Sequence, residues 1–142
     1  MIRVALDFAR TMLRFPAGWL IWIAALILVN GVAPIVFLPA PEAVITLATF
    51  MLAAMLQMAL FGRLGFVRLL GIGHVPWLAL VPWAWLRSGV LPVGSPMRIW
   101  LIALVLLNTG SLLIDAADVV RYLRGEREPV LRLDVGHRED PP

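Results

Sequence analysis

The feature that most restricts the fold of this chain is the stretch 97–122, which is apolar at first and then becomes polar along one face. Its polar side chains recur at steps of three and four residues, the spacing of one face of an α-helix. They are Asn108, Ser111, Asp115, Asp118 and Tyr122. A carboxylate that faces lipid costs roughly 2.5 kcal/mol or more. We therefore expect a membrane-spanning helix whose polar face packs against protein or water.

The composition indicates a polytopic helical membrane protein. Of the 142 residues, 61% are hydrophobic and 15% are charged, whereas a soluble domain carries about 25% charged residues. The apolar residues fall in four blocks, each close to the roughly 20 residues that a helix needs to cross the hydrocarbon core of a bilayer. The expected fold class is all-α, a bundle of four transmembrane helices within residues 15–122. The predicted spans cover about 17–38, 43–61, 69–91 and 98–120.

An arm and a tail flank this predicted bundle. Residues 1–14 place four charged side chains at helical spacing with apolar side chains opposite, which predicts an amphipathic helix lying on the membrane surface. A cleaved signal peptide is the less favoured interpretation, because the apolar stretch that follows is too long for one. In the tail, residues 123–142, apolar and charged side chains alternate over 130–135 as in a strand. Six residues cannot form a sheet alone, so we expect this segment to add to a partner or to lie against the bundle.

The distribution of arginine predicts the orientation of the chain. All twelve basic residues are arginine: three lie in the arm, two in the connection after the second span and five from Arg121 onward. The opposite connections hold only Arg87 and Arg98. Because arginine is enriched on the cytoplasmic side of membrane proteins, we expect both termini in the cytoplasm of a bacterium and the spans in its inner membrane. No basic cluster with interleaved aromatic residues lies outside the membrane ends, so no nucleic-acid partner is expected.

The third predicted span is irregular near its start. Gly71, Gly73 and Pro76 lie within six residues, and glycine and proline both weaken an α-helix. One interpretation is a broken helix of the kind that marks binding sites in transporters. The favoured one is simpler: a glycine-rich turn precedes a helix that begins near Val75, with Pro76 in its first turn.

Isolated polar residues in the other spans predict contacts between helices. Pro34 leaves the carbonyl group of Asn30 without its helical partner, so we expect a kink there and a hydrogen bond from Asn30 to another helix. Gln57 is expected to bond to a neighbouring helix as well. A methionine stripe in the second span favours adaptable packing over copper binding, because the chain has no cysteine and no histidine nearby. The stripe consists of Met51, Met55 and Met58.

The candidate site is a polar cluster at the cytoplasmic end of the bundle. His74 begins the third span on that side, and Asp115 and Asp118 end the fourth span there, so the topology brings them to one depth. Asn108, Ser111 and Gln57 lie behind them. Such a cluster can carry protons, hold a cation or bind a metal. The favoured alternative is structural: Asp118 pairs with Arg121 or with another arginine, and His74 caps a helix.

The known enzyme motifs are absent from the sequence. There is no glycine-rich phosphate loop, no G-x-S-x-G, no H-E-x-x-H and no histidine pair suited to haem. The lack of cysteine excludes disulfides and thiolate metal sites. We therefore assign no catalytic residue, no cofactor and no metal site, and we expect a protein that is not an enzyme. A membrane enzyme that uses His74 and Asp115 as acid and base is the alternative.

Two function classes follow from these features besides that enzyme. The small size, the methionine stripe and the tail favour an accessory, assembly or scaffold component of a membrane complex. Its partners would be the lipid bilayer and either another membrane protein or further copies of this chain in a homo-oligomer. The second class is a small oligomeric transporter or channel, in which the Asp115/Asp118 face and His74 form a proton or cation path. Acidic residues paired with arginines would favour the first class, and a cavity that joins His74 to Asp115 would favour transport or catalysis.

Overall fold

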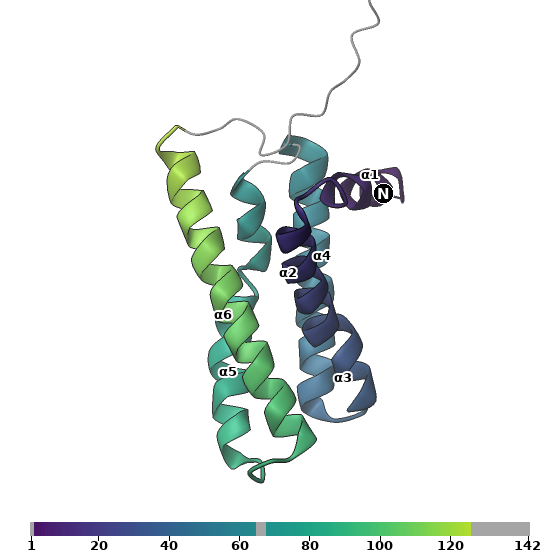
Figure 1. Ribbon diagram of the computed structural model, residues 1–142, viewed down its shortest axis with the longest axis vertical. Coiled ribbons are helices and arrows are strands. Elements are labelled where there is room, and N and C mark those ends of the chain that lie inside the picture. The colour runs from purple at the N-terminus through teal and green to yellow at the C-terminus, as the bar shows by residue number, and fades with distance from the viewer. Residues whose placement is uncertain (1, 65–67, 126–142) are drawn as a thin grey trace, which may run out of the picture.

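The computed structural model describes residues 2–64 and 68–125, which form helices and short connections with no strand among them (Figure 1). Three helical stretches are long and apolar enough to cross a membrane: Ala17–Val36, Pro41–Leu64 and Pro96–Leu123. The all-α class expected from the sequence is therefore confirmed. Residues 126–142, including the alternating segment 130–135, lie outside the described part of the chain.

The first candidate span is interrupted at the position that the sequence marks. Helix α2 (Ala17–Ile27) passes into a π-helical turn, η1 (Leu28–Val32), and then into the short α3 (Ala33–Val36). Pro34 has no amide hydrogen to give to the carbonyl group of Asn30, and a widened turn is a common response to a missing helical hydrogen bond. The expected irregularity at Asn30 is thus present as a π turn.

The other two candidate spans are continuous helices with recognisable ends. Helix α4 (Pro41–Leu64) begins with Pro41 and Glu42 in its first turn. Helix α6 (Pro96–Leu123) begins after Ser95, whose hydroxyl group accepts a hydrogen bond from the amide of Arg98. It ends just before Gly125, whose φ of 107° is a left-handed conformation that glycine adopts without strain.

The segment between α4 and α6 differs from the single helix expected over residues 69–91. It consists of a 3-10 helix, η2 (Arg68–His74), a two-residue break and α5 (Trp77–Val90). Pro76 stands directly before α5, so this helix begins two residues later than predicted, and a 3-10 helix replaces the expected glycine-rich turn. With its 14 residues, α5 rises about 21 Å, less than the roughly 30 Å of a hydrocarbon core.

The helices pack around one buried face of α6. Helix α5 lies along the first half of α6, and η2 packs against both α6 and α4 (Figure 1). The buried residues of α6 recur at helical spacing and include the first two positions of the predicted polar stripe. They are Trp100, Leu101, Leu104, Asn108 and Ser111. Asp115, Asp118 and Tyr122 continue this face but are only partly buried, so the packing loosens toward the C-terminal end.

The outer surface of the bundle is apolar. Large hydrophobic side chains such as Ile21, Val36, Leu106 and Leu113 are 68–80% exposed. An exposed apolar surface of this extent suits lipid rather than water.

The N-terminal arm forms α1 (Ile2–Met12), which lies across the bundle at the end where α4 and α6 finish (Figure 1). The rings of Phe8 and Phe61 meet edge to face with centroids 5.4 Å apart, which joins α1 to the end of α4. Asp7 and Arg10 form an exposed ion pair at 3.8 Å on the other side of α1. The arm is therefore an amphipathic helix at one end of the bundle, as its spacing predicts.

Candidate functional site

Two of the buried polar contacts in the bundle hold helices together and are separate from the candidate site. The side-chain amides of Asn30 and Asn108 donate to each other's oxygen atoms at 2.8 and 2.9 Å, and both residues are fully buried. The predicted hydrogen bond from Asn30 to another helix is confirmed. Because the two amides satisfy each other, Asn108 belongs to this structural pair.

The second contact is an ion pair at the opposite end of the bundle from α1. Nε and Nη2 of Arg87 donate to Oε1 of Glu42 at 2.8 and 2.6 Å. The Glu42 side chain is 4% exposed and that of Arg87 is 43% exposed. The sequence analysis missed this pair, although Glu42 in the first turn of α4 and Arg87 in the last turn of α5 meet wherever these helices run antiparallel.

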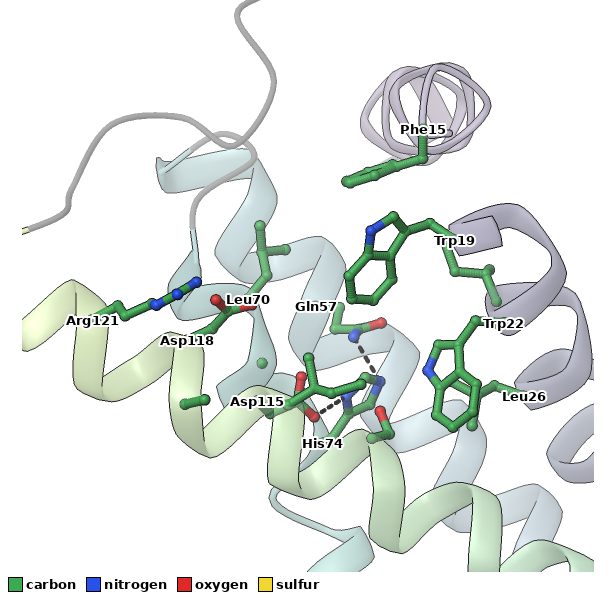
Figure 2. Close-up of a pocket in the computed structure, with 15 residues that line it drawn as sticks. Phe15, Trp19, Trp22, Leu26, Gln57, Leu70, His74, Asp115, Asp118 and Arg121 are labelled. Atoms are coloured by element: carbon green, nitrogen blue, oxygen red, sulfur yellow. Dashed lines mark hydrogen bonds and ion pairs between the residues drawn. The ribbon is translucent and has the colours of Figure 1, made fainter. Parts of the chain in front are cut away.

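The candidate site is centred on His74, which joins three helical segments. Its Nδ1 lies 2.7 Å from Oδ2 of Asp115 on α6, and its Nε2 lies 2.8 Å from Nε2 of Gln57 on α4 (Figure 2). An amide nitrogen can only donate, so Nε2 of His74 accepts and its Nδ1 carries the proton that is donated to Asp115. Trp77 stacks on the imidazole with ring centroids 4.1 Å apart. The orientation of His74 is therefore fixed on both edges and on one face.

Two glycines allow this close arrangement. A Cβ atom on Gly71 would lie 2.8 Å from Cβ and Oδ1 of Asp115, and one on Gly73 would collide with the side chain of Gln57. Each glycine thus lies against one of the two residues that hydrogen-bond His74, and η2 approaches α6 and α4 closely for this reason. From the sequence, these glycines are recognisable only as residues that weaken a helix. The signal for their second role is their position, three residues and one residue before the only histidine in the predicted spans.

A cavity of about 570 Å³ lies between α2 and α6 and reaches the His74 cluster. On the α2 side, Phe15, Trp19, Trp22 and Leu26 form an aromatic and aliphatic wall, and the two indoles point toward α6 and η2 (Figure 2). Trp22 comes close to α6 because residue 110 is glycine: a Cβ there would lie 3.0 Å from the indole. The opposite wall carries the polar side chains of the cavity, which are Gln57, His74, Ser111, Asp115, Asp118 and Arg121. Leu70, Gly71, Ile114 and Ala117 also line this wall.

Five of the six residues predicted for the site line this cavity. His74, Ser111 and Asp115 lie toward the inner end of the cavity, near the middle of the bundle, whereas Arg121, on the last turn of α6, is exposed. The structural interpretation paired Asp118 with Arg121 or with another arginine. Arg121 forms no ion pair among the described residues, whereas the pairing of Asp118 with another arginine stays a prediction. It also made His74 a helix cap, whereas the ring of His74 binds Asp115 and Gln57. The polar stripe is thus joined to a histidine and lines a cavity.

The cavity is closed toward the middle of the bundle. One and two turns inward from Ser111 along α6, Asn108 and Leu104 are fully buried. Within residues 2–64 and 68–125, no group of three or more histidine, aspartate or glutamate side chains could hold a metal ion. The His74–Asp115 pair lies next to a space that can hold a small molecule.

Three features define the site: the His74–Asp115 pair, the tryptophan wall opposite it and a cavity that ends within the bundle. Comparison with protein-family models, with curated proteins and with solved structures finds no match for the chain.

Proposed function

We propose that this chain is a small carrier of the bacterial inner membrane, which binds a small molecule in the cavity and exchanges it for a proton held by His74 and Asp115. The observation that carries the proposal is the cavity that reaches this pair. A histidine and a carboxylate that touch at 2.7 Å and remain accessible from a cavity can take up and release a proton as the cavity fills. A carrier of this kind needs no covalent step, and the proposed function is therefore not that of an enzyme.

The proposed topology has four membrane segments and both termini in the cytoplasm. Helices η2 and α5 follow each other along α6, and together they form the fourth segment beside the three long apolar helices (Figure 1). Arg10 and Arg124 then lie at one end of the bundle, while Arg87 and Arg98 lie at the other. The first end is the cytoplasmic one by the enrichment of arginine on that side.

Two features favour a carrier over a pore. The cavity ends at Asn108 and Leu104, so no continuous path crosses the bundle in this conformation. Irregular backbone lies on both sides of the site, as the π turn η1 in the first span and as the break between η2 and α5. Broken helices at membrane depth surround the substrate sites of many secondary transporters, where the halves move relative to each other.

The absence of cysteine from the chain makes a direct test available. Ser111→Cys places one thiol at the cavity wall, and a membrane-impermeant thiol reagent is added to intact cells or to inverted membrane vesicles. A carrier exposes residue 111 to each side in turn, so we expect labelling in both preparations. Leu106→Cys, on the lipid-facing side of α6 at 68% exposure, is the control that should stay unlabelled because it meets no water. Labelling of Ser111→Cys from one side only contradicts the carrier.

An accessory role in a membrane complex is the second candidate, and the surface of α4 favours it. Met51 and Met55 are 56% and 48% exposed, so most of the methionine stripe is available to a partner helix. A photo-crosslinking amino acid at Met55 would then give one protein adduct of defined mass in native membranes. The same amino acid at Leu113 is the control, because that side chain is also exposed but lies on α6. Adducts with lipid alone at both positions contradict the accessory role.

A further inference from the structure

The two walls of the cavity differ in chemistry, and this difference specifies the ligand. We infer that the cavity binds a lipophilic aromatic cation, whose charge lies against Asp115 and whose rings lie against Trp19 and Trp22. The inference deepens the proposed function and rests on it only for transport, since binding can be measured without any movement across a membrane. It depends on the carboxyl group of Asp115, on the aromatic wall that α2 forms and on the size of the cavity.

The inner end of the cavity presents a carboxyl group whose hydrogen-bond partner is an imidazole. With Gln57 donating to His74 and His74 donating to Asp115, the imidazole is neutral, so an ionised Asp115 has no cationic partner among the described residues. His74 and Asp115 have side chains that are only 15% and 18% exposed. A partly buried carboxylate without a cationic partner is unfavourable in a membrane, so either a bound cation or a second proton stabilises it.

Ser111 adds a polar group that the protein itself leaves unused. The residue is 4% exposed, lines the cavity one turn from Asp115, and forms no hydrogen bond among the described residues. Its hydroxyl group is therefore available to a polar group of a ligand, or to water that accompanies the ligand.

The α2 wall suits the apolar part of such a cation. Trp19 and Trp22 are three residues apart on one face of α2, and both indoles point across the cavity toward His74 (Figure 2). An indole face attracts a cation, and it also stacks on aromatic rings. At about 570 Å³ the cavity has the size of a site for a drug-like molecule.

Other ligand classes fit less well. An anion would meet Asp115, and among the described residues of the lining the one basic side chain, that of Arg121, is exposed at the end of α6. A neutral amphiphile such as a quinone would leave the carboxylate of Asp115 uncompensated. Among the groups that line the cavity, α2 and α4 contribute no charge, η2 contributes His74, and α6 contributes Asp115, Asp118 and Arg121. Protons are therefore the natural competitors of the cation at this site.

The test is equilibrium binding of tetraphenylphosphonium to the purified full-length protein in mild detergent. Tetraphenylborate is the matched control ligand, because it has nearly the same size and shape but the opposite charge. We expect saturable binding of the cation at one site and no binding of the borate. Affinity should fall as the pH is lowered, by up to about tenfold per pH unit once protons compete for the same site.

Two variants locate the binding site. Asp115→Asn should weaken binding by about tenfold or more, as expected for the loss of an interaction with a charged group. Trp22→Leu should weaken it by about threefold to tenfold. Trp85→Leu is the control, since Trp85 is 60% exposed on α5 and does not line the cavity, and its affinity should equal that of the wild type.

Specific outcomes overturn the inference. These are the absence of saturable binding, equal affinity for the borate, or an affinity that neither Asp115→Asn nor Trp22→Leu changes. If Asp115→Asn does not fold, two measurements still test the inference. They are the pH dependence of tetraphenylphosphonium binding to the wild type and the affinity of the Trp22→Leu variant. Cation binding together with one-sided labelling of Ser111→Cys would contradict the carrier and support this inference. Labelling of Ser111→Cys from both sides without cation binding would support the carrier and contradict the aromatic cation as its ligand.

Discussion

The role of Asp115 is decided by its partner, which is a histidine and not an arginine. An asparagine side chain has nearly the same shape as aspartate, and its oxygen can still accept the proton of Nδ1 of His74. We therefore expect Asp115→Asn to keep the free energy of unfolding within about 1 kcal/mol of the wild type, measured by unfolding in detergent. The charge is lost, so cation binding should fall in the same sample.

The free energy of unfolding of Asp115→Asn is best compared with that of Arg87→Leu, which breaks the ion pair at the other end of the bundle. It leaves the carboxylate of Glu42, 4% exposed, without its partner. Leaving a buried acceptor without its partner costs about 1–3 kcal/mol, so this variant should be less stable than Asp115→Asn. A cost for Asp115→Asn as large as that for Arg87→Leu would show that the His74–Asp115 pair is chiefly structural.

The amide pair Asn30–Asn108 gives a separate prediction, which concerns folding alone. Asn108→Leu leaves the fully buried amide of Asn30 without its partner on α6 and should cost about 1–3 kcal/mol of unfolding free energy. Replacing both asparagines by leucine removes the unpaired group, so the double variant should recover part of this loss. Unfolding of the two single variants and the double variant in detergent measures the coupling. If the loss of stability in the double variant equals the sum of the losses in the two single variants, the pairing is contradicted.

At the level of elements, helical periodicity in the sequence predicts the part of the site that lies on one helix. The steps of three and four residues in α6 correctly place Asn108 and Ser111 on its buried face, and Pro34 correctly marks the irregular turn at Asn30. Contacts between elements are harder to predict, because they depend on which helices become neighbours. The Glu42–Arg87 pair depends on the antiparallel packing of α4 and α5. The close approach of η2 to α6 likewise depends on the missing side chain at Gly71.

Gly71 allows that approach to be tested directly. In Gly71→Ala the new methyl group would lie 2.8 Å from Asp115, so η2 must move away from α6 and the hydrogen bond of His74 must lengthen. Overpacking of this kind costs about 1–3 kcal/mol, which unfolding in detergent measures. Gly89→Ala in α5 is the control: no atom lies within 4 Å of its new Cβ, and its stability should match or slightly exceed that of the wild type. Equal stability of the two variants would contradict the close packing of η2.

For the whole molecule, the decisive question is whether the broken segment η2–α5 crosses the membrane. In both possible topologies an N-terminus in the cytoplasm places Ala40, between α3 and α4, in the periplasm. If η2 and α5 together cross, Gly94 also lies in the periplasm and the C-terminus returns to the cytoplasm. If only the three long apolar helices cross, Gly94 is cytoplasmic and the C-terminus is periplasmic.

We expect the four-segment topology, because α5 and η2 cover the buried face of α6 at successive positions along it (Figure 1). The arginines agree with this arrangement: Arg121 and Arg124 then lie on the cytoplasmic side, where arginine is enriched. A reporter enzyme that is active only in the periplasm, fused after Ala40, Gly94 or Pro142, should therefore give activity at the first two positions and none at the third. Activity at Ala40 and Pro142 without activity at Gly94 would establish three crossings. The η2–α5 segment would then enter and leave the membrane on the cytoplasmic side, and the cavity beside His74 would need a different route to the periplasm.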